Sequence, residues 1–109
     1  MAKKLNNNQK LWNRALKAIP TGNMFLSKNP SRFLDNCWPT YFNKSKGCEV
    51  WDLTNKRYYD FSLMGVGTNI LGYANKKIDK EVQKVIKKRN LTTLNCPEEV
   101  VLAENLTAL

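Results

Sequence analysis

The stretch from Cys48 to Tyr73 constrains the fold of this chain most, because its two halves need different backbone geometries. The first half holds two runs rich in β-branched and aromatic residues, 49–53 and 57–61, a composition typical of paired strands. Between these runs, Asn55 tolerates a positive φ angle and can serve a tight turn. We therefore predict a β-hairpin over this half.

The second half of the stretch is rich in glycine, with Gly65, Gly67 and Gly72 among small and apolar residues. Glycines at this density let a backbone bend sharply and approach a ligand closely. Their spacing does not match a nucleotide-binding fingerprint. A hairpin that feeds such a loop, with a helix after it, is suited to presenting backbone atoms to a small molecule.

Hydrophobic spacing predicts a helix ahead of this stretch, from about residue 8 to residue 19. Its apolar residues repeat at i, i+3, i+4 and i+7, as on one face of a packing helix: Trp12, Ala15, Leu16 and Ile19. Asn7 or Asn8 can cap its start, and Pro20 stops it. Residues 1–8 are polar, and we predict that they form a disordered tail.

Two more helices are predicted after the stretch. The first runs from its cap at Asn75 to about Lys88, with lysines opposite an apolar face formed by Ile78, Val82, Val85 and Ile86. The second begins after Asn95 or Cys96, with Pro97 in its first turn. The chain is expected to stop inside this helix, without a capping glycine, which would be an unusual end for a natural domain.

A short strand over 40–43, with Tyr41 and Phe42 buried, would give the sheet a third strand, and 44–47 would form the turn after it. The predicted fold class is therefore α+β, with an N-terminal helix, a small three-stranded antiparallel sheet and two further helices. Segment 21–39 is an irregular connector of a length that is often functional. Asp52 and Asp60 are expected to accept backbone hydrogen bonds at turns and strand ends, and not to catalyse.

Composition excludes several kinds of site. The chain has 18 Lys and Arg residues against 9 Asp and Glu, and this net charge of +9 invites a nucleic-acid-binding function. We expect no nucleic-acid partner, because the charge is spread along the chain. Cys37, Cys48 and Cys96 form no Cys-x-x-Cys pair, and histidine is absent, which argues against a zinc site and a disulfide framework. We expect the thiols to be reduced and mostly buried, in a cytoplasmic protein. We also expect no membrane-spanning segment.

The motifs of the stretch resemble the start of class III aminotransferases, which are pyridoxal-phosphate (PLP) enzymes of fold type I. The matching residues are Lys46-Gly47, Val50-Trp51-Asp52, Lys56-Arg57-Tyr58, Asp60-Phe61, Gly65-Val66-Gly67 and Ile70-Leu71-Gly72. Within that class the chain is most similar, from about Leu11 to Leu109, to the branch that contains glutamate-1-semialdehyde aminomutase. The resemblance implies that residues 9–109 are the small domain and the start of the cofactor domain of an incomplete fold type I enzyme.

The resemblance also implies substrate-binding residues. Asn29-Pro30-Ser31-Arg32 is similar to a Ser-Pro-x-Arg pattern that enters the active site in this branch, with Asn29 in place of the serine. Arg32 would offer a bidentate fork to a carboxylate; the alternative is a solvated surface arginine. Val66, Gly67 and Thr68 would lie against the substrate, near the cofactor ring. Val66 replaces an aromatic residue and makes that pocket wall smaller. Weaker candidates lie in a later loop at the mouth of the site: Thr92, Thr93 and Asn95.

For the mechanism, the resemblance implies PLP as the cofactor of the full-length enzyme. The Schiff-base lysine, the acidic partner of the pyridine nitrogen and the phosphate-binding loop lie beyond the matched stretch. We therefore expect no catalytic, cofactor-binding or metal-binding residue here, and no activity from this chain alone. The full enzyme would be a cytoplasmic homodimer that transfers an amino group to a carbonyl substrate, or shifts it within one substrate. The alternatives are a small basic nucleic-acid-binding protein and a non-catalytic interaction module.

Overall fold

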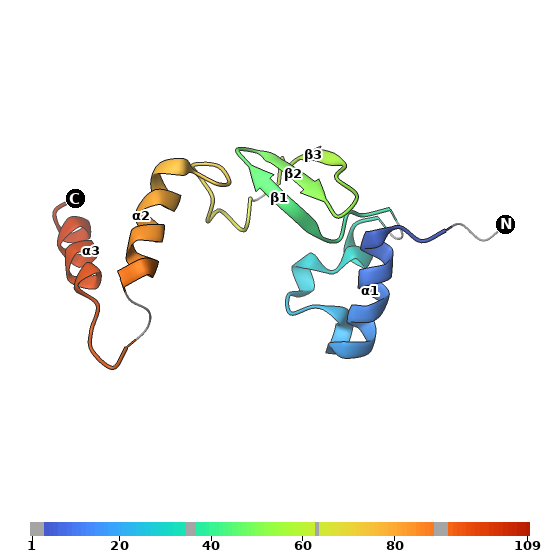
Figure 1. The fold of residues 1–109 in the computed structure, drawn as a ribbon, viewed down its shortest axis with the longest axis horizontal. Coiled ribbons are helices and arrows are strands. Elements are labelled where there is room, and N and C mark those ends of the chain that lie inside the picture. The colour runs from blue at the N-terminus through green and yellow to red at the C-terminus, as the bar shows by residue number, and fades with distance from the viewer. Residues whose placement is uncertain (1–3, 35–36, 63, 89–91) are drawn as a thin grey trace. The chain divides into compact units, whose positions relative to one another are not determined.

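The computed structural model describes residues 4–34, 37–62, 64–88 and 92–109. The chain divides into two compact units, Met1–Asn75 and Lys76–Leu109. Among the described residues, the first unit contains one α-helix, three short 3₁₀ turns and a three-stranded sheet, and the second contains two α-helices (Figure 1). The predicted α+β fold class is confirmed.

Helix α1 (Asn7–Ala18) begins one residue earlier than predicted. Its cap is Asn6, and not Asn7 or Asn8, because Gln9 lies three residues after Asn6 and completes a capping box. The Asn6 side chain accepts from the Gln9 N–H at 3.0 Å, and the Gln9 side chain accepts from the Asn6 N–H at 2.9 Å. Residues 7 and 8, which we placed in the tail, therefore belong to the helix.

The sheet has the order β1-β2-β3 and is antiparallel throughout: β1 is Phe42–Lys46, β2 is Glu49–Asp52 and β3 is Arg57–Tyr59. The predicted hairpin is confirmed, and Asn55 has the positive φ angle, 62°, that its turn needs. The first strand was placed wrongly. It continues through the predicted turn as far as Lys46, because two residues, Gly47 and Cys48, are enough for the turn to β2, and Gly47 has a φ angle of 58°.

The prediction that Tyr41 and Phe42 are buried is also wrong, since Tyr41 is half-buried and Phe42 is 70% exposed. Phe42 lies at the end of an edge strand, next to a bulge that shifts the pairing between Phe42 and Lys44. A bulge leaves local residues unpaired and bends the strand, so the alternation of buried and exposed side chains fails there.

The connector after α1 folds into three 3₁₀ turns: η1 (Pro20–Gly22), η2 (Leu26–Lys28) and η3 (Pro30–Arg32). Gly22 is buried against the Trp12 ring, and a Cβ atom there would lie 2.6 Å from a ring carbon. The connector therefore packs back onto the apolar face of α1.

The second unit consists of α2 (Lys76–Lys88) and α3 (Pro97–Thr107). Helix α3 does not run to the end of the chain as predicted, because Ala108 is its C-cap. The Thr107 hydroxyl donates to carbonyl oxygens in the preceding turn, at 3.0 and 3.1 Å, which is a local alternative to further helix. No described helix has the length and apolar character to cross a membrane.

Burial is sparse in the part of the chain that the structure describes. No large apolar side chain there is buried, although Pro30 is, whereas the polar residues Asn8 and Asp52 are 2% and 4% exposed. Cys37, Cys48 and Cys96 are free and exposed, so the prediction of mostly buried thiols is wrong. The reason is general: the described chain has too few packed layers to enclose an apolar core.

Candidate functional site

Asp52 fixes the hairpin that leads into the glycine-rich loop. Its Oδ1 accepts hydrogen bonds from the N–H and the hydroxyl of Thr54, at 2.7 and 2.6 Å, and from the Lys56 N–H at 3.1 Å. The carboxylate thus accepts hydrogen bonds from backbone N–H groups of the turn between β2 and β3 and stabilises that turn. The prediction that Asp52 ties down a turn is confirmed.

The other oxygen of Asp52 connects the hairpin to α1. Asp52 Oδ2 accepts from the Tyr58 hydroxyl at 3.2 Å and from Asn8 Nδ2 at 3.1 Å. Burial raises the pKa of Asp52, whereas the hydrogen bonds from Thr54, Lys56 and Tyr58 lower it. The hydrogen bonds have the larger combined effect, so the pKa of Asp52 lies below its ordinary value. Asp52 is therefore an ionised structural anchor at neutral pH, without a proton to give.

Asp60 anchors the start and the end of the glycine-rich loop, residues 62–73. The Ser62 N–H donates to Asp60 Oδ1 at 2.9 Å, and the Tyr73 hydroxyl donates to Asp60 Oδ2 at 2.6 Å. Tyr73 also forms an antiparallel bridge with Gly47, with N–H to O distances of 2.8 and 2.9 Å. Both ends of the loop are thereby fixed to the sheet.

The loop contains a left-handed turn. Met64, Gly65, Val66 and Gly67 have φ angles of 39°, 74°, 61° and 79°. This conformation costs a non-glycine residue about 1–2 kcal/mol, and it is rare for a β-branched residue such as Val66. Packing does not offset that cost, because Val66 is 71% exposed and Ile70 is 88% exposed. Strain of this kind gathers at functional sites, so the turn marks the loop as a candidate site.

The left-handed turn leaves backbone donors available. Among the described residues, no acceptor receives the N–H of Val66 or of Gly67, whereas the Thr68 hydroxyl donates to the Gly65 carbonyl at 2.7 Å. Backbone N–H groups that follow one another in such a turn can bind an anion or a carbonyl oxygen. The site can therefore bind an oxygen-bearing ligand through these backbone donors.

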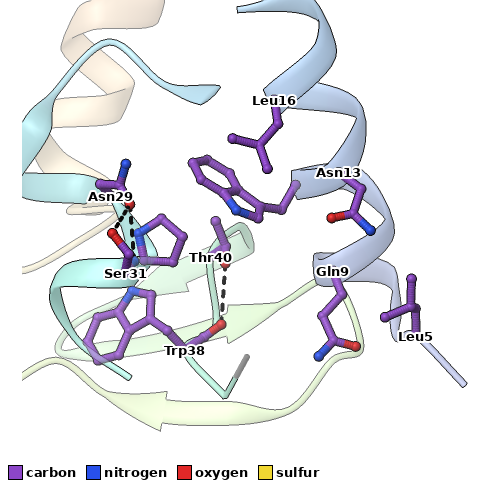
Figure 2. A pocket seen from close by; sticks show the side chains of 10 residues that line it. Leu5, Gln9, Asn13, Leu16, Asn29, Ser31, Trp38 and Thr40 are labelled. Carbon is purple, nitrogen blue, oxygen red and sulfur yellow. Dashed lines mark hydrogen bonds between the residues drawn. The ribbon is translucent and has the colours of Figure 1, made fainter. Parts of the chain in front are cut away.

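A pocket of about 340 Å³ lies between α1 and the connector (Figure 2). Figure 2 shows Gln9, Asn13 and Leu16 on the helix side, with Ser31 and Trp38 on the connector side. Asn29 Oδ1 accepts from the Ser31 N–H at 3.0 Å and from the Ser31 hydroxyl at 2.7 Å, which shapes the 3₁₀ turn η3. The lining includes no charged residue: Leu5, Gln9, Trp12, Asn13, Leu16, Asn29, Pro30, Ser31, Trp38 and Thr40.

The four predicted substrate residues stay in two groups. Arg32 ends η3 and is exposed, next to the pocket but not part of its lining. Val66, Gly67 and Thr68 lie in the loop, and no hydrogen bond joins them to Arg32 among the described residues. Of the weaker candidates, Thr92 is exposed and its hydroxyl accepts from the Leu94 N–H at 3.1 Å. The predicted connector over 90–95 begins with residues outside the described range.

Two asparagines make contacts that the sequence pattern did not predict, although Asn8 was a candidate cap of the first helix. Asn8 lay in the predicted tail, and no local signal announces a partner 44 residues away in Asp52. Asn69 holds the left-handed turn from inside the loop. Its position soon after closely spaced glycines was the available signal, since asparagine often hydrogen-bonds nearby backbone where the chain turns.

Three similarities bear on identity; no family model matches the chain. Glutamate-1-semialdehyde 2,1-aminomutase of Aquifex aeolicus (strain VF5) is 36% identical over 99 residues, which are 89% of this chain and 22% of the relative. The Sphingopyxis sp. MTA144 FumI protein, solved in its PLP internal aldimine form, superposes with a TM-score of 0.77 at 28% identity. That match covers 89% of this chain and 23% of the solved one. A transaminase solved with PLP bound superposes with a TM-score of 0.76 at 25% identity, over 98% of this chain and 24% of the other.

The chain is a relative of PLP-dependent aminotransferases and aminomutases. The resemblance read from the stretch around the glycine-rich loop is thereby confirmed. This aminotransferase-like chain spans 22–24% of the length of the relatives it matches. The activity of those full-length relatives can therefore only be proposed for this chain.

The described residues of this aminotransferase-like chain do not form a PLP site. A lysine that bonds PLP covalently needs a desolvated pocket that favours its neutral form. Every described lysine is exposed. No described group of three or more His, Cys, Asp or Glu side chains could hold a metal ion either. No chemical step can be assigned to PLP on these residues.

Proposed function

We propose that this chain is the substrate-facing segment of a PLP-dependent aminotransferase or aminomutase, with the loop 62–73 against a small amino or keto substrate. The observation that carries the proposal is the strained left-handed turn. Among the described residues, the N–H groups of Val66 and Gly67 have no acceptor. They lie in a loop that is fixed to the sheet at both ends, in a chain that superposes on a PLP-bound transaminase over 98% of its length. The longer enzyme transfers an amino group to a carbonyl compound, or moves it within one compound.

In this proposal the chain binds and orients the substrate. The N–H groups of Val66 and Gly67 donate to a substrate oxygen, the Val66 side chain limits the size of the substrate, and Thr68 continues the same wall. Arg32 pairs with a substrate carboxylate once the rest of the enzyme brings η3 and the loop to the same ligand. PLP, held by residues outside this chain, supplies the electron sink for bond cleavage next to the amino group.

The proposal includes the setting of the enzyme. The loop and Arg32 are separate within one chain. A second subunit could complete the substrate site, and we therefore propose that the enzyme is a homodimer. The three free, exposed cysteines fit a reducing compartment, and we propose the cytoplasm.

A chimeric enzyme tests this function. Residues 11–109 replace the corresponding segment of the Aquifex aeolicus aminomutase, and bound PLP, subunit mass and turnover are measured. We expect a dimer with PLP and measurable turnover. In that chimera, Arg32→Ala raises KM about 10- to 100-fold with PLP retained, the range expected for losing hydrogen bonds to a charged group.

The control for this variant is Arg14→Ala, which removes an exposed arginine of α1 outside the proposed site. It is expected to leave KM unchanged. A chimera that holds PLP as a dimer yet turns over no amino substrate would contradict the proposed function. An unchanged KM in Arg32→Ala would remove Arg32 from it.

A further inference from the structure

Asn69 closes the left-handed turn with both its side chain and its backbone. Its Nδ2 donates to the Met64 carbonyl at 3.1 Å and to the Thr68 hydroxyl oxygen at 3.2 Å, and its N–H donates to the same Met64 carbonyl at 3.3 Å. Its own carbonyl accepts from the Gly72 N–H at 2.8 Å. Asn69 is half-buried, whereas its neighbours Thr68 and Ile70 are exposed. The side chain thus points into the loop.

Gly65 supplies the room that the Asn69 side chain occupies. A Cβ atom at residue 65 would lie 2.7 Å from Asn69 Nδ2 and 3.0 Å from the Thr68 hydroxyl oxygen. The φ angle of Gly65, 74°, also favours glycine. Gly65 and Asn69 therefore act together: the absence of a side chain at Gly65 leaves the space that the Asn69 amide occupies.

The Thr68 hydroxyl also supports the middle of the loop, since it donates to the Gly65 carbonyl at 2.7 Å. Among the described residues, however, only Asn69 donates to the Met64 carbonyl, at the start of the left-handed turn. The hydrogen bonds of Asp60 and Tyr73 fix the ends of the loop, and the exposed side chains of Val66 and Ile70 contribute little packing. Without the Asn69 amide, Val66 is expected to relax to a negative φ angle, because that conformation is favoured for a β-branched residue. The N–H groups of Val66 and Gly67 would then point elsewhere.

We propose that Asn69 is a positioning residue, which locks the left-handed turn so that the N–H groups of Val66 and Gly67 converge on a carboxylate or another oxyanion of the ligand. The oxyanion part of this inference rests on the proposed function. The conformational part does not, and the 109-residue chain can test it alone.

The first measurement is nuclear magnetic resonance of the 109-residue chain, in which carbon shifts and N–H to Hα couplings report φ angles. Positive φ is expected at residues 64–67 in the wild type, and a negative φ at Val66 in Asn69→Ala. Asn43→Ala is the matched control, since Asn43 is an exposed asparagine whose Nδ2 bonds Asn55 Oδ1 at 3.1 Å outside the loop. A positive φ at Val66 in Asn69→Ala would overturn the conformational part.

The second measurement titrates the same chain with sodium acetate, against sodium chloride at equal ionic strength, and follows the two amide resonances. We expect acetate to shift the Val66 and Gly67 amides of the wild type, and the apparent affinity to fall at least tenfold in Asn69→Ala. Adding Val66→Gly to Asn69→Ala should restore binding in part, because glycine accepts a positive φ without strain. A general loss of structure would not respond to that second change.

The outcomes separate the claims. Acetate that shifts neither amide in the wild type overturns the oxyanion role, and equal affinities in wild type and Asn69→Ala overturn the positioning role. The chimeric enzyme tests the proposed function independently of both.

Discussion

Tyr73 joins the end of the glycine-rich loop to the sheet through a hydroxyl that donates to Asp60 at 2.6 Å. Burial, then this hydrogen bond and the negative charge of Asp60, raises the pKa of Tyr73 from 10.0 to about 12. The folded chain therefore favours the neutral phenol. The stability that this pair contributes is complete below pH 10 and is lost as the pH rises toward 12.

Tyr73→Phe should remove that alkaline loss of stability. We expect the variant to be less stable than the wild type at neutral pH by about 1 kcal/mol, the usual net value of one hydrogen bond, and to converge with it as the pH rises from 10 to 12. Urea unfolding at several pH values measures this difference. Tyr59→Phe, at an exposed tyrosine, is the control. A constant gap between wild type and Tyr73→Phe across this pH range would contradict the assignment.

At the scale of elements, the loop meets the sheet where two glycines touch. A Cβ atom on Gly72 would lie 3.2 Å from the Cα atom of Gly47, beside the bridge between Gly47 and Tyr73. Gly72 has a φ angle of 89° and Gly67 one of 79°, but a Cβ atom on Gly67 would meet nothing within 4 Å. Both positions need a positive φ angle, but only Gly72 lies so close to another backbone segment that a Cβ atom would be crowded.

Gly72→Ala is therefore expected to destabilise the first unit more than Gly67→Ala. Both variants pay the left-handed cost of about 1–2 kcal/mol, and only Gly72→Ala must also separate two backbone segments. Urea midpoints give the difference, and hydrogen exchange of the Gly47 amide reports the bridge directly. Equal midpoints, with an unchanged exchange rate at Gly47, would show that the close approach has no energetic consequence.

Local patterns predicted the helices well and the first strand poorly. The apolar residues of α1 and α2 repeat every three or four residues, so their limits fell within one or two residues of those observed. Strand β1 is mostly exposed and its pairing is irregular, so its sequence shows no alternation of apolar and polar residues that would have predicted it. The cap of α1 was missed because two further asparagines, Asn7 and Asn8, compete locally, and only the reciprocal bond from Gln9 selects Asn6.

At the scale of the whole molecule, large apolar side chains remain exposed in both units. In α2, Ile86 is 68% exposed, and in α3, Leu106 is 61% exposed. Apolar helix faces of this kind mark surfaces that associate with other protein. In the proposed function, the remaining length of an aminotransferase subunit and its partner would cover them.

The isolated chain should bind no PLP after dialysis. Because every described lysine is exposed, any adduct should form slowly, at several lysines, and reverse on dialysis. Intact mass after borohydride reduction should give the 12.6 kDa of the unmodified chain, whereas the chimeric enzyme should keep one PLP per subunit. A stoichiometric adduct at one lysine of the isolated chain would contradict the absence of a cofactor site.

The sequence by itself determined the α+β class, the hairpin, the glycine-rich loop and the relationship to aminotransferases, because each depends on residues that are close together in the chain. Only the tertiary structure decided which side chains hold these parts together. The bond from Asn8 to Asp52, the bridge from Gly47 to Tyr73 and the left-handed turn under Asn69 depend on backbone placement and on atoms brought together by folding. Periodicity and composition carry no information about such contacts, since they require a specific geometry at both partners.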